Sequence, residues 1–415
     1  MSSPAQYEDR FAAFRHDSFK RYFWARFLSA SAIQIMATAV GWQIWKVTGN
    51  AWLLGLIGLV QFLPALLLVL VTGLAADKLG RRRVMGSAIV LQMICALGIL
   101  GLAVTGNFNA VWVLGLLALF GVARAFHTPA SSSLVVNVVP QKDFGNAIGW
   151  VTSSWQLASV AGPAAGGLLY GISGPFAYAV AALLFATSAI LIFSLEKPAQ
   201  DMETASTNWN TILGGFRFIW QEKVVLGAIS LDLFAVLLGG AVALLPIYAD
   251  QILDVGPWGL GLLRAAPGVG AIIMIAILIR FPVRNHAGTI LLLTVAAFGA
   301  ATAVFGVSTT AWVSITALAL LGAFDMVSVY IREILLQLWT PDRMRGRVNA
   351  VNAIFLGASN ELGEFRAGAM AAIYGAVFTV TAGGAAAIAV AGLWRVLFPK
   401  MSKTQKLEAP YSRQE

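Results

Sequence analysis

Residues 139–149 read VPQKDFGNAIG, and residues 340–350 read TPDRMRGRVNA. A shift of 201 positions superimposes the two stretches and places Pro140 on Pro341. Similarity between two loops would explain one such match. Here the match continues through the apolar segments on both sides and keeps the loop cations and several glycines in register. We interpret it as a parallel internal repeat, so the chain consists of two similar halves.

The composition excludes an ordinary soluble enzyme. Of 415 residues, 59% are hydrophobic and 11% are charged, whereas a soluble globular protein carries roughly a quarter charged residues. A bilayer-spanning helix needs about 20 mostly apolar residues. The chain holds about twelve such runs separated by short polar breaks. This leaves no room for a separate soluble domain.

The twelve apolar runs predict twelve membrane spans. They cover residues 22–47, 51–76, 84–105, 110–136, 144–171 and 176–195 in the first half, and 222–248, 258–279, 287–306, 311–338, 348–375 and 378–398 in the second. We expect an all-α membrane protein in which two six-helix bundles are related by a pseudo-twofold axis along the membrane normal. The expected domains are residues 1–195 and 222–415, joined by a cytoplasmic linker at 196–221.

Lys and Arg cluster on one side of the predicted membrane. They lie in the breaks after even-numbered spans and near both ends of the chain. The breaks after odd-numbered spans contain essentially no Lys or Arg, and their charged residues are acidic, such as Asp250 and Asp254. The positive-inside rule then places both termini in the cytoplasm. The net charge of +9 therefore reflects topology, and we expect no nucleic acid partner. Because the first 21 residues contain no apolar core, we also expect no cleavable signal peptide.

The polar linker precedes an amphipathic stretch. Apolar residues recur at helical spacing from Trp209 to Ile219, beside Arg217. Either this stretch forms a separate interfacial helix, or it extends the seventh span.

The break between spans two and three reads GLAADKLGRRR from Gly73 to Arg83. It resembles the cytoplasmic signature of the major facilitator superfamily, Gly-x-Leu-Ala-Asp-Arg-x-Gly-Arg-Arg. The matching residues are Gly73, Ala76, Asp77, Gly80, Arg81 and Arg82. The resemblance implies that Asp77 contacts the positive end of a helix in the other half and latches one conformation. A loop that merely follows the positive-inside rule would explain the arginines, but not the spacing of Asp77 and Gly80.

Span five carries a second signature. It runs from Gly149 through Ala158 to GPAAGG at 162–167, and it resembles the antiporter signature of exporters in the same superfamily. The residues that carry it are Gly149, Gly162, Pro163, Gly166 and Gly167. A proline bends a membrane helix, and small residues allow close packing. The resemblance implies a sealed interface that favours export, whereas a generic packing face is the alternative. Glu364 replaces the proline in the repeat, so the bend is not duplicated.

Three further stretches narrow the resemblance. FHTPA at Phe126, ALLPIYA at Ala243 and RMRGRVNAVN at Arg343 are similar to the branch of enterobactin exporters and related bacterial secretion-type facilitators. This resemblance covers residues 15–400. It implies export of a siderophore or drug in exchange for protons across the bacterial inner membrane.

Ionisable residues inside predicted spans must avoid lipid, since each would cost about 2.5–3.5 kcal/mol there. The spans contain Arg124, Asp232, Arg264, Asp325, Arg332, Glu333, Glu361, Glu364 and Arg366. Arg124 and Asp325 are repeat partners near mid-membrane, so we expect a salt bridge across the pathway that protonation of Asp325 releases. Asp232 or Glu361 could carry the proton instead. Alternatively, such pairs are static struts, as we expect for Arg332, Glu333 and Arg366.

Polar uncharged residues in spans also tend to face inward. We expect Gln34 and Gln156 to line the cavity, beside Trp155. His127 is either a hydrogen-bonded helix residue or a proton relay. No Walker loop, metal cluster or catalytic triad is present, so we expect no cofactor, no metal and no enzyme activity.

These patterns predict a secondary transporter that works by alternating access. The most specific expectation is proton-coupled export of a small amphipathic compound by a monomer in the lipid bilayer. Uptake of a nutrient or a metal, or a sensor or scaffold without turnover, are the alternatives that remain open.

Overall fold

The computed structural model describes residues 10–196 and 209–407, and this part of the chain is all-α apart from one isolated bridge between Asn285 and Lys406. The first six long helices are α1 (Asp17–Thr48), α2 (Ala51–Leu79), α3 (Arg81–Val104), α4 (Ala110–Val138), α5 (Phe144–Ile172) and α6 (Gly174–Phe193). The second six spans are α8 (Lys223–Gly239) with its continuation, α10 (Gly256–Arg280), α11 (Ala287–Val307), α12 (Ala311–Trp339), α13 (Asp342–Tyr374) and α14 (Ala376–Leu397). The predicted twelve-helix fold is confirmed.

Among the described residues, ten of these spans contain a stretch that is long and apolar enough to cross a membrane; in α2 this stretch is Ala51–Leu68. The two long helices outside that set are α5 and α13. They correspond to each other in the repeat, and both lie between the halves, where α5 packs on α10 and α13 packs on α2. Their greater polarity fits this position, because they face protein and a cavity more than lipid.

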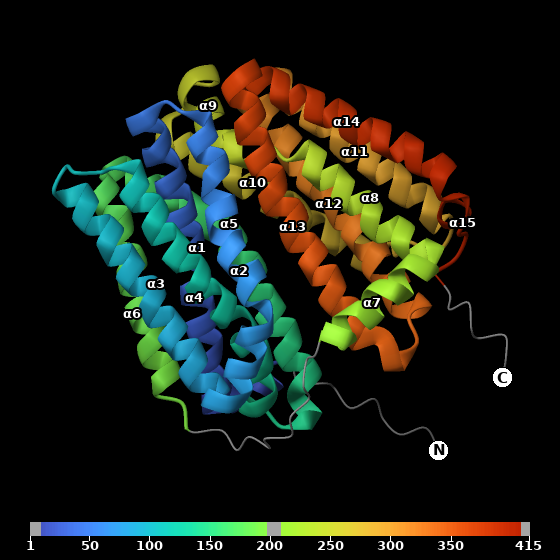
Figure 1. Ribbon diagram of the computed structural model, residues 1–415, viewed down its shortest axis with the longest axis horizontal. Coiled ribbons are helices and arrows are strands. Elements are labelled where there is room, and N and C mark those ends of the chain that lie inside the picture. Colours follow the sequence, from blue (N-terminus) through green and yellow to red (C-terminus); the bar gives the residue numbers. More distant parts are fainter. Residues whose placement is uncertain (1–9, 197–208, 408–415) are drawn as a thin grey trace.

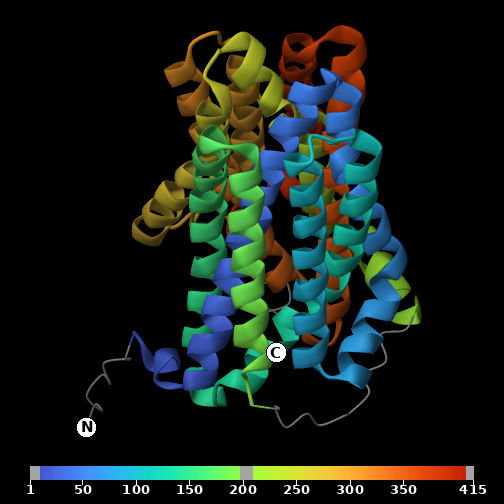
Figure 2. The same cartoon turned by 90° about the vertical axis from the view of Figure 1, so that its left-hand side faces the viewer.

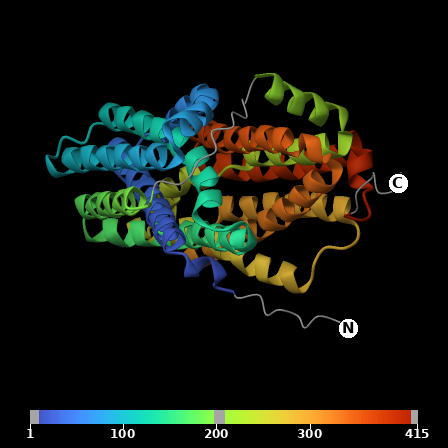
Figure 3. The same cartoon turned by 90° about the horizontal axis from the view of Figure 1, so that it is seen from below.

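The helices form two bundles that lie side by side. Figure 1 and Figure 3 show the N-terminal half in blue and green next to the C-terminal half in yellow and red. Figure 2 shows the helices of the N-terminal half running roughly parallel between the two ends of the molecule. One end holds the start of α1, the end of α6 and the α2–α3 turn with Arg81; we call it the basic face. The other end holds the turns at Gly49 and Ser173; we call it the opposite face.

Short turns at the opposite face have local causes. Gly49 ends α1 with φ of 59°, a left-handed conformation that glycine adopts without a steric penalty. Asn50 then caps α2, since its side-chain oxygen accepts a hydrogen bond of 2.9 Å from the Trp52 amide. Asn109 caps α4 in the same way through the Val111 amide, at 2.8 Å. The opposite face also holds one cation that the sequence interpretation overlooked, Lys46, which pairs with Asp250 at 3.0 Å.

The seventh span is broken. It was predicted as one helix, but α8 ends at Gly239 and the chain continues through η3 (Val242–Leu244), α9 (Leu245–Ile247) and the π-helical η4 (Tyr248–Ile252). A break leaves backbone carbonyls without helical partners. Arg366 from α13 supplies donors to them, with hydrogen bonds of 2.8 Å to the Leu237 carbonyl and 2.5 Å to the Leu238 carbonyl. Arg366 therefore caps a helix end, and it forms no ion pair with another described residue, contrary to our expectation.

The stretch after the linker is a separate helix, α7 (Trp209–Gln221), which Glu222 divides from α8. Ile219 is buried in a cluster with Val225, Leu336 and Val348, and the rings of Phe216 and Phe355 lie 5.4 Å apart. α7 is thus docked on the C-terminal half at the basic face (Figure 1).

The repeat appears in the packing between the halves. A Cβ atom on Gly368 of α13 would lie 2.5 Å from the Cα atom of Gly55 on α2. A Cβ atom on Gly167 of α5, the repeat partner of Gly368, would lie 2.8 Å from the Cα atom of Gly261 on α10. Both contacts are near the opposite face, where the bundles meet. Toward the basic face α2 and α13 diverge (Figure 1).

Candidate functional site

A cavity of about 750 Å³ lies between the two halves. Its N-terminal wall comes from α1, α2, α4 and α5, and its C-terminal wall comes from α10, α13 and the broken part of the seventh span. Apolar side chains such as Ile33, Leu117, Phe120 and Trp155 make up much of the surface. Its volume falls in the range of about 300–1,000 Å³ that is typical of small-molecule sites.

Ionisable side chains line both walls. The N-terminal wall carries Arg26, Arg124 and His127, and the C-terminal wall carries Arg264, Glu361 and Glu364. These charged groups face the cavity and not lipid. They therefore avoid the full free-energy cost of placing a charge in the hydrocarbon of the bilayer.

One ion pair joins the two walls. A guanidinium nitrogen of Arg124 on α4 lies 3.1 Å from a carboxylate oxygen of Glu361 on α13. The Arg124 side chain is 45% exposed and the Glu361 side chain 15% exposed. The pair therefore bridges the halves while one member stays in contact with the cavity, and it can break without leaving a charge stranded in the core.

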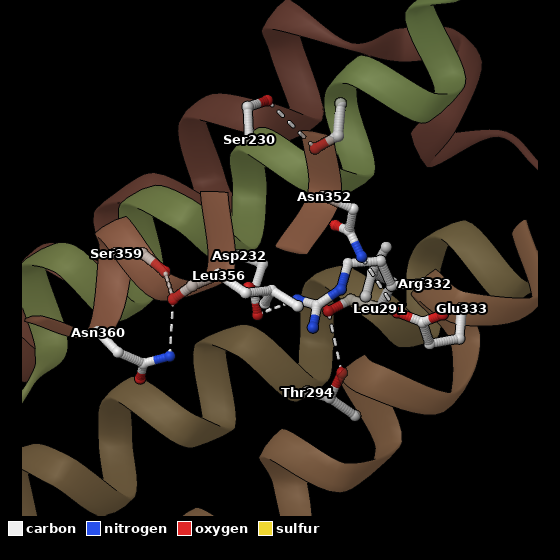
Figure 4. A network of polar contacts seen from close by, with 11 residues as sticks. Ser230, Asp232, Leu291, Thr294, Arg332, Glu333, Asn352, Leu356, Ser359 and Asn360 are labelled. Atoms are coloured by element: carbon white, nitrogen blue, oxygen red, sulfur yellow. Dashed lines mark hydrogen bonds and ion pairs between the residues drawn. The ribbon is translucent and has the colours of Figure 1, made fainter. Parts of the chain in front are cut away.

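We expected from the sequence that Arg124 pairs with Asp325. The structure does not form this pair. Asp325 and Arg332 are seven residues apart, so they share one face of α12, and that face turns toward α8 and α11. There Asp232 forms an ion pair with Arg332 (Figure 4). Asp232 and Asp325 line a separate small pocket with Phe298 and Ser328. Neither lines the central cavity in the part of the chain that the structure describes.

Of the uncharged residues that we predicted to line the cavity, some do and one does not. Gln34 lines the cavity, as does Trp155. Gln156 instead points at the neighbouring half, where its side-chain nitrogen donates to the Gly268 carbonyl of α10 at 3.4 Å. Glu333 accepts a hydrogen bond of 3.3 Å from Asn352 (Figure 4). Among the described residues, no group of three or more His, Cys, Asp or Glu side chains could hold a metal ion.

The glycines of span five pack α5 on two helices. A Cβ atom on Gly162 would lie 2.5 Å from the Cβ atom of Gln34, and one on Gly166 would lie 3.1 Å from the Cα atom of Ile35, both on α1. Gly167 faces α10 of the other half, as described above. Pro163 lines the cavity. A Cβ atom on Gly149 would meet no atom within 4 Å, so the contacts concern only the later part of the motif.

The α2–α3 signature lies at the basic face. Gly80 has φ of 91° and forms the sharp turn between the helices. Arg81 donates to the Ser133 carbonyl at 3.0 Å and to the Asn137 side chain at 2.9 Å on α4. Arg82 donates to the carbonyl of Leu195, which lies two residues after the end of α6. Gly73 and Asp77 belong to the last turns of α2, but the Asp77 side chain is outside the part that the structure describes.

Sequence reasoning missed Arg26. It lies inside the first predicted span, yet it was not counted among the membrane charges. The signal was present, because an arginine within an apolar run is by itself unusual. In the structure a guanidinium nitrogen of Arg26 donates to the Ser131 hydroxyl oxygen at 2.5 Å.

Two pseudo-symmetric six-helix bundles around a central cavity define a major facilitator transporter. The family model described as "Transmembrane secretion effector" matches residues 8–414, and the chain belongs to this family. It is a multi-pass membrane transporter.

Curated relatives include the "Enterobactin exporter EntS" of Shigella boydii serotype 4 (strain Sb227) and that of Escherichia coli O1:K1 / APEC. Each is 26% identical over 382 residues, which cover 89% of this chain and 88% of the relative. The comparisons find transporters, in agreement with the expectation that the chain is not an enzyme.

Solved structures share the fold at low identity. A bacterial homologue of the human lysosomal transporter Spinster, in an inward-facing and unoccupied conformation, has a TM-score of 0.70 at 14% identity, covering 96% of this chain and 97% of that one. A bacterial homologue of the iron transporter ferroportin, in an inward-facing state, has a TM-score of 0.70 at 16% identity, covering 93% and 98%.

Proposed function

We propose that this protein exports a small amphipathic compound from the cytoplasm in exchange for protons, by alternating access. The observation that carries the proposal is the Arg124–Glu361 ion pair, which joins the two halves at 3.1 Å inside the central cavity. A charge pair between two moving bodies, exposed to the pathway, is a suitable point at which protonation can control movement.

The closed opposite face is compatible with the proposed direction of export. Glycine contacts at Gly55–Gly368 and Gly167–Gly261 join the halves near the opposite face, and Lys46 pairs there with Asp250. If the basic face is cytoplasmic, as the positive-inside rule predicts, the cavity opens toward the cytoplasm, where an exported compound is loaded. Both termini would then be cytoplasmic.

Glu361 is our choice for the proton carrier. Protonation would remove the charge that attracts Arg124 and so release one half from the other. Glu364 lies three residues later on α13, hence on the same helical face, and lines the same cavity with Arg264. A proton could therefore move between two carboxylates without leaving the pathway. We assign Asp232 a structural role beside Arg332.

The two signatures have mechanical roles in this proposal. The α2–α3 signature with Gly73, Asp77, Gly80, Arg81 and Arg82 would latch the basic face when the cavity opens on the other side. The span-five glycines would keep the seam between the halves sealed against leakage during movement.

The enterobactin exporters among the relatives favour a siderophore or a drug of similar character as substrate. We further propose that the protein works as a monomer in the bacterial inner membrane, with the substrate and protons as its partners.

Everted inner-membrane vesicles provide the test. Upon acidification of the vesicle interior, wild-type vesicles should accumulate at least one compound from a panel of dyes, antibiotics and catecholate siderophores, and a protonophore should abolish the accumulation. Glu361→Gln should lose the response to the gradient. Glu333→Gln is the matched control, because Glu333 is a carboxylate of the neighbouring α12 outside the cavity lining, and a glutamine retains its acceptor for Asn352. Gradient-dependent transport by Glu361→Gln at the wild-type level would contradict the proposal.

A further inference from the structure

The two walls of the cavity differ in charge. The acidic residues that line it, Glu361 and Glu364, both come from α13, and the ionisable residues of the N-terminal wall are Arg26, Arg124 and His127. Since Glu361 is bound to Arg124 and Glu364 shares the C-terminal wall with Arg264, Arg26 faces the cavity without a carboxylate partner among the described residues.

Arg26 and His127 each have one side-chain nitrogen without a hydrogen-bond partner in the described part of the chain. The Nε atom of Arg26 is buried without a hydrogen-bond partner, and so is the Nε2 atom of His127. His127 as a whole is 9% exposed, and both residues line the cavity. Because these two nitrogens are enclosed by protein, a ligand can reach only the part of the Arg26 side chain that lines the cavity.

The surroundings hold these groups in position. Ser131 accepts the hydrogen bond from Arg26 at 2.5 Å, and the Tyr22 hydroxyl binds the Ser131 carbonyl at 2.8 Å. His127 and Ser131 are four residues apart and therefore share a face of α4. We call Arg26, His127 and Ser131 the Arg26 corner.

We propose that the Arg26 corner binds the anionic group of the transported compound, so that the cavity selects an amphipathic organic anion, such as a carboxylate, sulfonate or phenolate, over its neutral analogue. This inference rests on the proposed function and adds the charge of the substrate. A guanidinium group presents several N–H donors in a plane and matches the oxygens of an oxyanion. The apolar wall near Ile33, Phe120 and Trp155 then accommodates the hydrophobic body.

A matched pair of fluorescent probes tests the charge preference. 1-Anilinonaphthalene-8-sulfonate carries a sulfonate, and N-phenyl-1-naphthylamine has the same rings without it. Binding is measured to the full chain in phosphatidylcholine nanodiscs, after subtraction of empty discs, without a proton gradient. We expect the sulfonate to bind more tightly than the amine. Because the measurement is at equilibrium, it is independent of whether protons drive transport.

Variants locate the preference. Arg26→Gln should weaken sulfonate binding about 10-fold or more, which corresponds to about 1.4 kcal/mol, and should leave binding of the neutral amine unchanged. Arg280→Gln is the control, since Arg280 is an exposed arginine at the end of α10 that does not line the cavity. Should Arg26→Gln fail to fold, Arg26→Lys and Ser131→Ala test the same corner with smaller changes. Each should reduce only sulfonate binding.

Four outcomes would overturn the inference. Equal affinity of the wild type for the two probes would remove the charge preference. Equal weakening of both probes by Arg26→Gln would indicate a structural role, and an equal effect of Arg280→Gln would indicate a general surface potential. Phosphatidylglycerol in the discs serves as a further arm: if it abolishes sulfonate binding at equal ionic strength, the corner holds a lipid head group and not a transported anion.

Discussion

Two arginine–carboxylate pairs in this protein have the same chemistry and different surroundings. Arg124 and Glu361 join the two halves across the cavity, with side chains 45% and 15% exposed. Arg332 and Asp232 join α12 to α8 within one half, with side chains 2% and 8% exposed. The first pair can exchange its partner for water when the halves move, whereas the second cannot. The two ion pairs carry the same charges, so the difference in burial explains why one can break during movement and the other holds two helices together.

The buried pair should have the largest effect on stability. Arg332→Leu leaves Asp232 and Asp325 facing one small pocket without a cation, so we expect a loss of about 3–5 kcal/mol in the free energy of unfolding. The double variant Arg332→Leu with Asp232→Leu should recover at least half of that loss, because it removes the stranded charge. Chemical unfolding in detergent measures both. A single variant that unfolds like the wild type would show that this pair is not a strut.

The contact between the halves at the opposite face should have the second-largest effect on stability. In Gly368→Ala the added methyl would press on the Gly55 backbone at 2.5 Å, and overpacking of this kind costs about 1–3 kcal/mol. We expect a lower melting temperature and at least 10-fold slower transport, since the halves can no longer close there. Gly392→Ala on α14 is the control, as a Cβ atom there meets no atom within 4 Å. Equal behaviour of the two variants would refute the close-packed seam.

The cavity pair should affect stability little and transport strongly. Glu361→Gln leaves Arg124 in contact with the cavity, so we expect at most about 1 kcal/mol of destabilisation, as for partly exposed ion pairs. The same variant should lose gradient-driven accumulation in vesicles. Melting and transport measured on one preparation separate the two effects. If Glu361→Gln were as unstable as Arg332→Leu, the contrast between the two pairs would be wrong.

The smallest effect is expected at the rim. Lys46→Ala removes an exposed partner of Asp250 and should cost about 0.2–1 kcal/mol. Asp250→Ala should cost more, because the Trp45 ring nitrogen also donates to Asp250 at 3.0 Å. Melting temperatures of the two variants give the order directly. The reverse order would mean that the Trp45 hydrogen bond contributes nothing.

Several features could be predicted from the sequence because they depend on local patterns. The length and apolarity of each run predict a span, and the repeat predicts the matched positions of Gly167 and Gly368 at the seam. The break after Gly239 could not be predicted in this way, since the seventh run is apolar on both sides of Gly239 and the Arg366 side chain that caps the break comes from a distant helix.

The pairing of charges within the membrane is a second feature that the sequence could not predict. The sequence by itself determined that about nine ionisable residues had to find protein or water within the membrane, because lipid would not accept them. Only the tertiary structure decided that Arg124 meets Glu361 and that Asp325 turns toward Arg332. That choice depends on the rotation of α12 and α13 about their axes, which is set by packing against many neighbours at once and leaves no trace in the spacing of a single run.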